Sequence, residues 1–568
     1  MNQKVFLIGI DGGTFDIINP LVEKGDLPNI SRFMREGTWG HLTSTLPPMT
    51  FPAWPASITG VNPGKLGVSY FIKDLHNYDP SEFVTTADIK TKKIWHYLGE
   101  YGKKSIIINI PYLYPPEKIN GIMACYFNSR GREDNVLTHP QELAKELSDV
   151  IDLDRLLKSR KDFAHISEFS KHTNRSQKEF WLDRLVNFHR TAIEYLKEAT
   201  LYLMTHYDWD FVMVVFNSSD FVQHKLWCYS EKDHPAYDKE LAGKYGDVIN
   251  DCYKRIDKAI GTIVNKIDKD TTVLLMSDHG FSSLKMNFYI NQWLKQKNLL
   301  YFKGKYKIAL CRVLLSQILT KLRISRFVSL LPERLKNMQI PILWRKRKAF
   351  SESVDWKRTK AYAHLNGINI NLKDREPQGI VTRDEYRDVV DFIKKELFTI
   401  TDDNTKQPIL SKVYEKNEIY HGPYAELATD LQFFFDPPVY GISTELFSDD
   451  RLFKVIDKTE KVTGAHQSAT QGIFIAHGKT IGREQKTDSP SIIDITPTIL
   501  YLLGIPIPNE MDGRVLTEIL EKEFLDTNPV RFTDDSVFEE GVTKLTEEFS
   551  DEMLDKVKSA LRDLGYID

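Results

Sequence analysis

The chain contains very few cysteines: 4 among 568 residues, at Cys125, Cys228, Cys252 and Cys311. No two of them are close enough in sequence to form a C-x-x-C metal clip, and the disulfide framework of a small secreted protein would be much denser. We therefore expect reduced thiols, most of them buried.

Long apolar runs are also missing. No run of about 18 apolar residues is present, so we expect no segment that crosses a membrane. The first residues, MNQKVFLIGIDGG, lead almost directly into an apolar strand pattern, without the apolar stretch and cleavage site of a signal peptide. These two absences predict a cytoplasmic protein.

An excess of charge of either sign is absent as well. The net charge is −3, with 27% charged and 41% hydrophobic residues. This composition is ordinary for a globular protein, and a chain of this length can bury a large core. A generic nucleic-acid-binding protein would be strongly basic, so nucleic acid is not expected as a partner.

Short apolar runs that end in polar residues are what the sequence does contain. Continuous runs rich in Val, Ile or Phe indicate strands buried on both faces, as in a parallel sheet. They cover residues 5–10, 105–110, 211–216, 272–276 and 472–476, and a further strand is predicted at 368–372.

Stretches with helical periodicity lie between the predicted strands. They cover residues 28–35, 93–100, about 176–206, about 239–266 and 383–397. The alternation predicts an α/β fold with a mostly parallel β-sheet flanked by helices. In such sheets ligands bind at the carboxyl ends of the strands, so the polar residues that follow the strands are the candidates for a site.

The predicted domain organisation is a core with inserted segments. We assign residues 1–74, 200–300 and 461–530 to the catalytic core, and 531–568 to a charged tail with a helix at 547–564. Residues 75–200 hold one clear strand and are predicted to be partly core and partly a helical cap. Residues 302–460 are predicted to form a second inserted cap.

Residues 302–350 are strongly basic, with thirteen Lys or Arg residues and one acid, Glu333. Leu310, Leu314, Ile318 and Leu322 recur every four residues, which indicates one amphipathic helix. Two interpretations are open. The segment is either a solvated surface helix, or a lid or membrane-surface element that meets an anionic substrate or the lipid headgroups of the inner membrane face.

Acids and histidines follow the predicted strands in four separated stretches. These residues are Asp11, Asp220, His224, Asp278, His279 and His466. Asp220 and His224 are four apart, which places both on one face if this segment is helical. Three carboxylates and three imidazoles at one sheet edge would be costly to pack without a cation. The mixed ligand set suits two divalent metal ions, Zn²⁺ in the first place and Mn²⁺ as the alternative.

Thr50 is the candidate nucleophile. It lies among the prolines of P-P-M-T-F-P-A-W-P, just before a predicted helix whose first turn could bind an anion. A threonine hydroxyl is a weak nucleophile that metal coordination would activate. Thr43, Ser44 and Thr45 are the alternative hydroxyl groups.

Three further residues compete with the predicted ligands. His477 follows an apolar strand and is interpreted as a core histidine rather than a ligand. His234 could replace His224, but only His224 is four residues from Asp220. Asp16 lies near Asp11 and is interpreted as a helix-start residue.

Seven motifs in this order resemble the alkaline phosphatase superfamily, specifically its type I phosphodiesterase/nucleotide pyrophosphatase branch. They are G-I-D-G-G at 9–13, P-P-M-T-F-P-A-W at 47–54, T-G-V-N-P-G-K at 59–65, D-F-V-Q-H at 220–224, S-D-H-G at 277–280, G-A-H at 464–466 and D-I-T-P-T-I-L-Y-L-L-G-I-P at 494–506. Within this branch, the sequence most resembles a prokaryotic subgroup that carries the motif D-x-x-Q-H-x-x-W, here at residues 220–227.

The resemblance implies an alkaline-phosphatase-like core and a role for each candidate residue. One metal would be held by Asp220, His224 and His466, and the other by Asp11, Asp278, His279 and the hydroxyl of Thr50. Thr50 would attack phosphorus in line and form a phosphothreonine intermediate, which is then hydrolysed. A sulfatase relative would need C/S-x-P-x-R, which none of the four cysteines provides.

The sequence departs from the nucleotide pyrophosphatases at two positions. The asparagine expected about twenty residues after the nucleophile is absent from residues 68–73, where Ser69 or Lys73 could take its place. The asparagine usual after T-F-P is Ala53. Nucleotide specificity is therefore not carried over from the resemblance.

The expected function is metal-dependent hydrolysis of a phosphodiester or pyrophosphate in a small-molecule or lipid-linked substrate. A phosphomonoesterase or phosphotransferase on the same site is the alternative. A non-catalytic binding protein on this scaffold would predict broken ligand positions or a missing nucleophile, and neither is seen. The sequence does not determine the oligomeric state.

Overall fold

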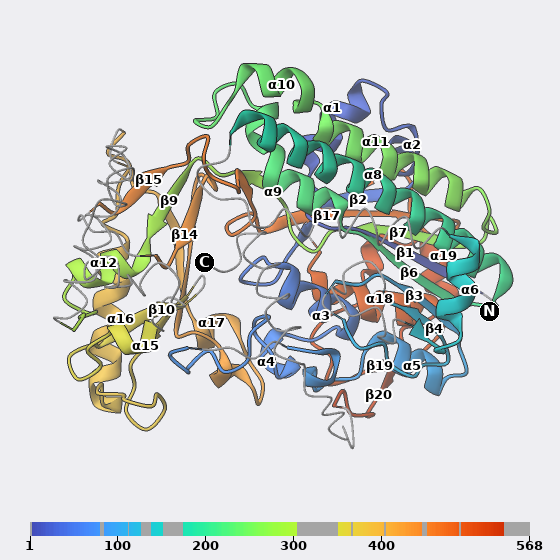
Figure 1. Cartoon of the computed structure of the whole chain (residues 1–568). Helices are drawn as coiled ribbons and strands as arrows, with labels where there is room; N and C mark the ends of the chain where they lie inside the picture. The colour runs from blue at the N-terminus through green and yellow to red at the C-terminus, as the bar shows by residue number, and fades with distance from the viewer. Residues whose placement is uncertain are drawn as a thin grey trace.

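The computed structural model describes residues 3–79, 84–111, 113–125, 138–151, 174–303, 350–364, 367–402, 405–445, 451–487 and 490–538. Most of the predicted basic segment at 302–350, the predicted helix at 547–564 and Cys311 lie outside these residues. The described chain forms two lobes, the larger on the right of Figure 1 and the smaller on the left.

A nine-stranded sheet forms the centre of the larger lobe (Figure 1). Its strands, in spatial order, are β18 Gln485–Lys486, β2 Thr38–Thr43, β17 Gln471–His477, β7 Thr272–Met276, β1 Val5–Ile10, β6 Phe211–Phe216, β3 Ser105–Ile108, β4 Gly121–Ala124 and β5 Thr138–His139. The neighbours from β7 to β4 all run parallel. Every residue of β1, β6 and β7 is buried, which explains their unbroken apolar runs. The predicted α/β class is confirmed.

The predicted strand at 472–476 exists as β17, but its direction differs from the expected parallel one. β17 pairs antiparallel with both β7 and β2. A continuous apolar run indicates burial on both faces and contains no information on direction, so the sequence could not decide this point. As a consequence, the amino end of β17 lies at the sheet edge where the parallel strands end.

Helices cover both faces of the sheet. Successive side chains of a strand point to opposite faces, and Phe6 and Ile8 of β1 belong to one buried cluster while Val5 and Leu7 belong to the other. The first cluster is completed by α1 Phe15–Glu23, α2 Pro28–Glu36, α8 Arg175–His206, α9 Ser218–Ser230 and α11 Val248–Val264. The second is completed by α3 Thr50–Thr59, α5 Ile94–Glu100 and α18 Ile495–Leu502.

The predicted helices that lie within the described residues are confirmed with one exception. Those at 28–35, 93–100 and 176–206 correspond to α2, α5 and α8. The single helix predicted at 239–266 is wrong, because the chain forms α10 Lys239–Tyr245 and then α11. Gly246 separates the two helices. A Cβ atom there would lie 2.6 Å from the carbonyl oxygen of Ala242, so this close approach of the chain requires glycine.

Residues 75–200 contribute more to the central sheet than the one strand expected. β3, β4 and β5 all belong to it, and α8 packs on its face. β4 has four residues and β5 two, too few for an apolar run to predict a strand. The division of the chain into core and cap domains stays a prediction.

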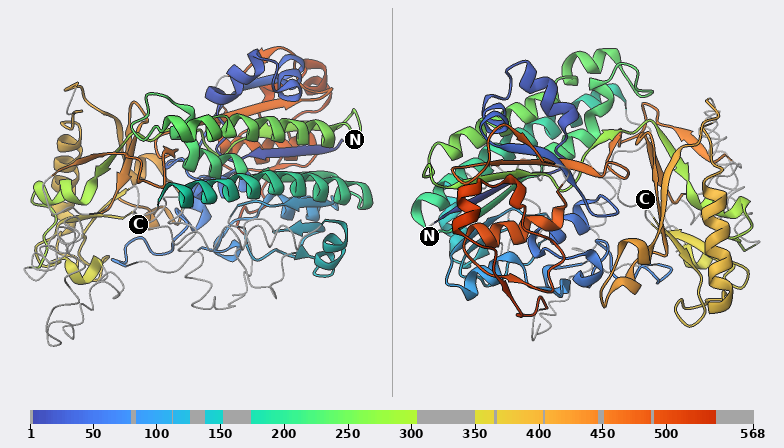
Figure 2. Two further views of the ribbon diagram at one scale, coloured as in Figure 1. Left: turned by 45° about the horizontal axis from the view of Figure 1, so that its top comes forward. Right: turned by 180° about the vertical axis from the view of Figure 1, so that it is seen from behind.

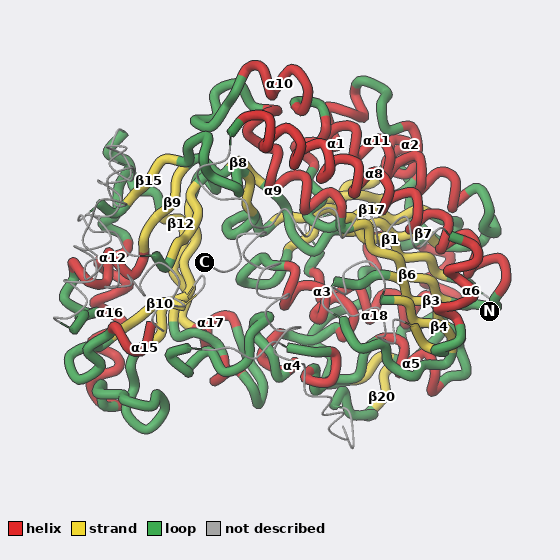
Figure 3. The backbone as a smooth tube through the Cα atoms, viewed as in Figure 1, coloured by secondary structure: helices red, strands yellow, loops and turns green. Residues whose placement is uncertain are grey.

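The smaller lobe is built around a four-stranded antiparallel sheet (Figure 3), ordered β10 Ala361–His364, β11 Gly367–Ile370, β13 Leu431–Phe435 and β12 Leu410–Glu415. β11 accounts for the strand predicted at 368–372, and the helix predicted at 383–397 is α16 Arg383–Leu397, which packs on the sheet. A three-stranded sheet of β14 Tyr440–Ser443, β9 Met286–Tyr289 and β15 Phe453–Val455 lies beside it. Figure 2 shows this lobe from two further sides.

The described residues bear on the expectations of reduced, buried thiols and of no membrane-crossing segment. Cys125, Cys228 and Cys252 are free and buried, and burial raises the pKa of the Cys125 thiol to about 12. No helix in the described part of the chain has the length and apolar character needed to cross a bilayer.

A buried ion pair beside the sheet gives a first testable prediction. Lys93, with 1% of its side chain exposed, lies 2.8 Å from Glu117, which also accepts a hydrogen bond of 2.7 Å from the indole of Trp95. Burial alone would raise the pKa of Glu117, but His96 and Lys93 lower it to about 2. A lowered carboxyl pKa adds stability above the ordinary value of 4.5, and this stability is lost as the pH falls toward 2.

We expect Glu117→Gln to lower the free energy of unfolding at pH 7 by about 3 kcal/mol, because it removes this contribution and the negative charge 2.8 Å from the buried ammonium of Lys93. The difference from wild type should shrink as the pH falls below 4.5. Urea denaturation across this range measures it. Glu100→Gln is the matched control, since Glu100 is paired with Lys92 but is 46% exposed, and it should cost at most about 1 kcal/mol. Equal losses in the two variants would contradict the prediction.

Candidate metal centre and active site

The predicted ligands lie at the edge of the central sheet where the parallel strands end. Asp11 follows β1 directly, and Asp278 and His279 follow β7 after one residue. Asp220 and His224 lie in the first two turns of α9, the helix after β6. β1 pairs with both β6 and β7, so the polar residues that follow these three strands lie next to one another at the sheet edge.

His466 reaches the same edge from the other direction. It follows β16 Gly464–Ala465 and precedes β17. Because β17 is antiparallel to β7, the segment before it lies where β7 ends. His477, at the far end of β17, therefore lies at the opposite edge.

The six predicted ligands come together, and His279 lies between two groups. Within each of the sets Asp220, His279, His466 and Asp11, Asp278, His279, ligand atoms lie within 4.8 Å of one another. His279 Nε2 is 3.1 Å from Asp278 Oδ2 and 3.8 Å from Asp11 Oδ1. The resemblance placed His279 with one metal only, whereas the structure places its ring next to both groups.

Asp220 is the centre of the other group. Its Oδ1 atom lies 3.4 Å from His224 Nε2 and 4.0 Å from His466 Nε2. The rings of His279 and His466 stack with centroids 3.7 Å apart. The two groups are thus adjacent parts of one cluster.

Each of the three imidazoles is oriented by a backbone carbonyl. The Nδ1 atoms lie 2.8 Å from Gly464 O in His224, 2.9 Å from Gly280 O in His279 and 2.8 Å from Pro48 O in His466. A carbonyl oxygen only accepts, so Nδ1 is the protonated nitrogen and Nε2 keeps its lone pair. All three rings therefore present Nε2 to the cluster in the tautomer that binds a metal ion.

The carboxylates leave oxygen atoms available inside the cluster. Among the described residues, Oδ1 of Asp11, Oδ1 of Asp220 and Oδ2 of Asp278 are buried and accept no hydrogen bond. The other oxygens of Asp11 and Asp278 accept hydrogen bonds, from Trp54 Nε1 at 3.3 Å and from Gly12 N at 3.1 Å. Buried carboxylate oxygens without donors are costly unless a cation neutralises them.

The pKa shifts describe the same electrostatic imbalance. Burial, followed by repulsion from Asp278 and Asp220, raises the pKa of Asp11 well above its usual range. Burial would also raise the pKa of Asp220, but the nearby His224, His466 and His279 lower it to about 2. Burial and the neighbouring imidazoles of His279 and His224 lower the pKa of His466. Divalent cations fit this donor set of imidazole nitrogens and carboxylate oxygens.

Thr50 lies against the cluster, at the first residue of α3. It is 4% exposed, and its Oγ1 atom is 3.2 Å from His279 Nε2. The predicted helix after it is confirmed, although Phe51 interrupts its regular geometry. The alternative hydroxyls have other contacts: Ser44 donates to Asp278 O and Thr45 donates to Pro47 O, while Thr43 is in β2.

Sequence reasoning missed several residues that position the ligands. The indole of Trp54 donates to Asp11 Oδ2 at 3.3 Å, and the hydroxyl of Ser219 donates to Asp11 O at 2.6 Å. The Gln223 amide donates to Gly12 O at 2.9 Å. Gly12 has φ +64°, and a Cβ atom there would lie 3.4 Å from Asp220 Oδ1. The spacing of Gln223, three residues after Asp220, could have indicated that both share a helix face.

The competing residues lie outside the cluster. His477 is not a core histidine as expected, because its side chain is 27% exposed and lies 3.6 Å from Glu36. His234 Nε2 is 2.9 Å from Leu284 O. Asp16 is in the first turn of α1, as its interpretation as a helix-start residue requires.

The two polar substitutes for the absent asparagine have separate surroundings. Lys73 forms an ion pair of 2.8 Å with Asp88. Ser69 lines a small cavity together with Pro47 and Gln432.

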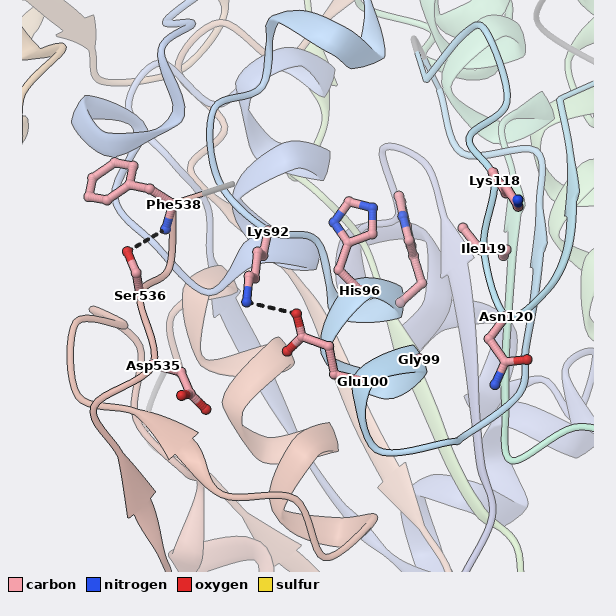
Figure 4. Close-up of a pocket in the computed structure, with 11 residues that line it drawn as sticks. Lys92, His96, Gly99, Glu100, Lys118, Ile119, Asn120, Asp535, Ser536 and Phe538 are labelled. Atoms are coloured by element: carbon pink, nitrogen blue, oxygen red, sulfur yellow. Dashed lines mark hydrogen bonds and ion pairs between the residues drawn. The ribbon is translucent and has the colours of Figure 1, made fainter. Parts of the chain in front are cut away.

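A cavity of about 870 Å³ lies away from this cluster (Figure 4). It is lined by α5 and by residues including Lys92, Asn120 and Asp535. Asn120 directly precedes β4, so the cavity lies near the edge where the parallel strands begin. Lys92 and Glu100 form an ion pair of 2.7 Å within it. The cavity is therefore separate from the candidate active site.

Comparisons with known proteins agree with the chemistry of the site. The family model described as type I phosphodiesterase/nucleotide pyrophosphatase matches residues 5–466. No curated protein matches the chain.

Solved structures similar to the chain include murine ectonucleotide pyrophosphatase/phosphodiesterase 5, both alone and as an inactive form in complex with AMP. Each has 12% identity, a TM-score of 0.47, and coverage of 91% of this chain and 100% of that chain. The human protein of the same name has 13% identity, a TM-score of 0.42, and coverage of 92% and 100%. On the match of the family model, the chain belongs to the type I phosphodiesterase/nucleotide pyrophosphatase family and is a hydrolase that acts on phosphoester bonds.

Proposed function

We propose that this protein hydrolyses phosphodiester or pyrophosphate bonds with Thr50 as the nucleophile and two divalent metal ions, Zn²⁺ or Mn²⁺. The observation that supports this most directly is the position of the Thr50 hydroxyl, 3.2 Å from Nε2 of His279, the residue next to both ligand groups.

The residues that would hold the metals follow from the two groups. Asp220, His224 and His466 would bind one ion. Asp11, Asp278, His279 and Thr50 Oγ1 would bind the other. The buried carboxylate oxygens without hydrogen bonds and the three Nε2 atoms supply suitable donors. When bound, the two ions supply positive charge that stabilises the attacking and leaving oxygens of an in-line displacement.

The chain's own groups perform the remaining tasks. Thr50 Oγ1 releases its proton to solvent and forms a bond to phosphorus, while the bond from phosphorus to the leaving oxygen breaks and that oxygen departs with the bonding electron pair. Attack by water on the phosphothreonine then releases the second product and restores the hydroxyl. Trp54 and the Gly12 N–H hold Asp11 and Asp278 in place by hydrogen bonds of 3.3 Å and 3.1 Å, so the site is organised before substrate arrives.

The substrate is proposed to be a small-molecule or lipid-linked phosphoester, and the location cytoplasmic. Peripheral contact of the basic segment at 302–350 with an anionic membrane stays a hypothesis about residues that mostly lie outside those described. Cosedimentation of the protein with vesicles containing anionic lipid would test it.

The proposed reaction is tested by comparing bis-p-nitrophenyl phosphate with p-nitrophenyl phosphate in the presence of Zn²⁺ or Mn²⁺. We expect kcat/KM for the diester to exceed that for the monoester by at least about tenfold, a difference of about 1.4 kcal/mol in transition-state binding. If the monoester reacts faster, the proposed site residues still stand, but the substrate would be a phosphomonoester rather than a phosphodiester. No hydrolysis of either compound with both metals would contradict the proposal for simple esters and require a screen of natural phosphoesters.

A further inference from the structure

The backbone just before Thr50 is held from two sides. Residues 44–49, here named the nucleophile loop, connect β2 to α3. His466 donates from Nδ1 to Pro48 O at 2.8 Å, which ties the loop to the metal cluster. The hydroxyl of Tyr420 donates to Leu46 O and ties the loop to the smaller lobe.

Tyr420 is itself fixed by the smaller lobe. It follows α17 Lys416–Ile419 and is 4% exposed. Its oxygen accepts a hydrogen bond of 2.7 Å from Nε2 of Gln432, a residue of β13. Burial raises the pKa of Tyr420 well above its usual value, so the hydroxyl keeps its proton and remains a donor. A chain of hydrogen bonds therefore runs from Gln432 through Tyr420 to the nucleophile loop.

The backbone around Tyr420 is held independently of this hydroxyl. Asn62 donates to Ile419 O at 2.9 Å and accepts from the N–H of His421 at 3.1 Å. Tyr424 N donates to Gly64 O at 2.9 Å. Asn62 and Gly64 follow α3, whereas Leu46 precedes it. The segment 419–424 of the smaller lobe thus contacts the chain on both sides of the helix that begins with Thr50.

We propose that Tyr420, oriented by Gln432, is a positioning residue that fixes the nucleophile loop and so aims the Thr50 hydroxyl at phosphorus. The smaller lobe then helps to set the geometry of the attack. This inference rests on the proposed role of Thr50 as nucleophile. Misplacement of a reacting group by about 1 Å can cost about 100-fold in rate, so one anchoring bond is enough to matter.

The test uses Tyr420→Phe, which removes the hydroxyl and keeps the ring. We expect the burst rate of p-nitrophenol release from bis-p-nitrophenyl phosphate to fall about 10- to 100-fold. KM, bound metal and Tm should stay close to wild type, because the backbone bonds at Asn62 and Gly64 remain. Hydrogen exchange of the peptide that spans residues 44–51 should become faster. Tyr424→Phe, a substitution in the same segment, is the matched control and should change none of these quantities.

A second variant tests the route of the effect. Gln432→Leu removes the partner of the Tyr420 hydroxyl and should lower the burst rate in the same direction. If both residues act through one chain of bonds, the double variant should lose less than the product of the two single losses.

The results distinguish failure of the Tyr420 anchor from failure of Thr50 as the nucleophile. Unchanged burst and exchange rates in Tyr420→Phe would overturn the inference, as would losses of Tm and metal that parallel the loss of rate. If wild type itself forms no phosphothreonine, the proposed function fails, whereas faster exchange of the loop in Tyr420→Phe would still support the anchoring.

Discussion

Replacing Thr50 with alanine is expected to lower kcat for phosphodiester hydrolysis by about four to six orders of magnitude, the scale seen when a covalent nucleophile is removed. The reason is that the Thr50 hydroxyl lies against a proposed ligand atom, with Oγ1 3.2 Å from His279 Nε2. Thr50→Ser keeps a hydroxyl and should retain measurable activity. Steady-state kinetics and mass spectrometry of the phosphorylated peptide measure both effects.

The control for this prediction is Thr43→Val. Thr43 is a partly exposed threonine at the end of β2, and its replacement should change kcat by less than about threefold, since substitutions that remove neither a ligand nor the nucleophile have small effects. A variant Thr50→Ala with wild-type turnover, or a phosphorylated residue other than Thr50, would disprove the assignment of the nucleophile.

Replacing Asp11 with asparagine is expected to have the second large effect, a loss of metal and of at least about 1,000-fold in kcat, because a ligand and a charge that stabilise the transition state are both removed. Asp11 is 2% exposed, and burial and the neighbouring carboxylates raise its pKa. In the metal-free protein this charge is therefore unfavourable. We expect the Tm of chelator-treated Asp11→Asn to equal or exceed that of chelator-treated wild type.

Wild type and Asp11→Asn should differ in how their Tm responds to added metal. Zn²⁺ or Mn²⁺ should raise the Tm of wild type, since a ligand that binds only the folded state stabilises it, and should raise that of Asp11→Asn much less. Elemental analysis gives the metal content of each. His477→Gln is the matched control, because His477 lies at the opposite end of β17 and is 27% exposed. A variant Asp11→Asn that binds two metals per chain would contradict the proposed ligand set.

The local parts of the site were predictable because they depend on neighbouring residues. The apolar runs of β1, β6 and β7 and the acids that follow them lie within a few residues of each other in sequence. Side-chain burial on both faces of a strand requires such runs, and parallel strands bring their carboxyl ends to one edge. The six candidate ligands were named on these grounds, and Thr50 was named from the proline-rich stretch before a predicted helix. The structure brings these residues together.

Other parts depend on contacts between distant residues. The direction of β17 follows from its pairing with β2 and β7, and this direction brings His466 to the cluster. The short strands β4 and β5 are defined by pairing rather than by an apolar run of their own. The break between α10 and α11 reflects the close approach of Gly246 to Ala242 O and to Tyr229 O, a residue of another helix.

The sequence by itself determined the α/β class, the order of the functional motifs and the residue types that can bind metal and attack phosphorus, because these depend on local periodicity and side-chain chemistry. Only the tertiary structure decided which carbonyl groups orient the three imidazoles and that His279 lies next to both ligand groups. It also decided that Tyr420 contacts Leu46 across 374 positions of sequence. The physical reason is that a hydrogen bond requires two groups at about 3 Å, and the fold brings residues so far apart in sequence to that distance.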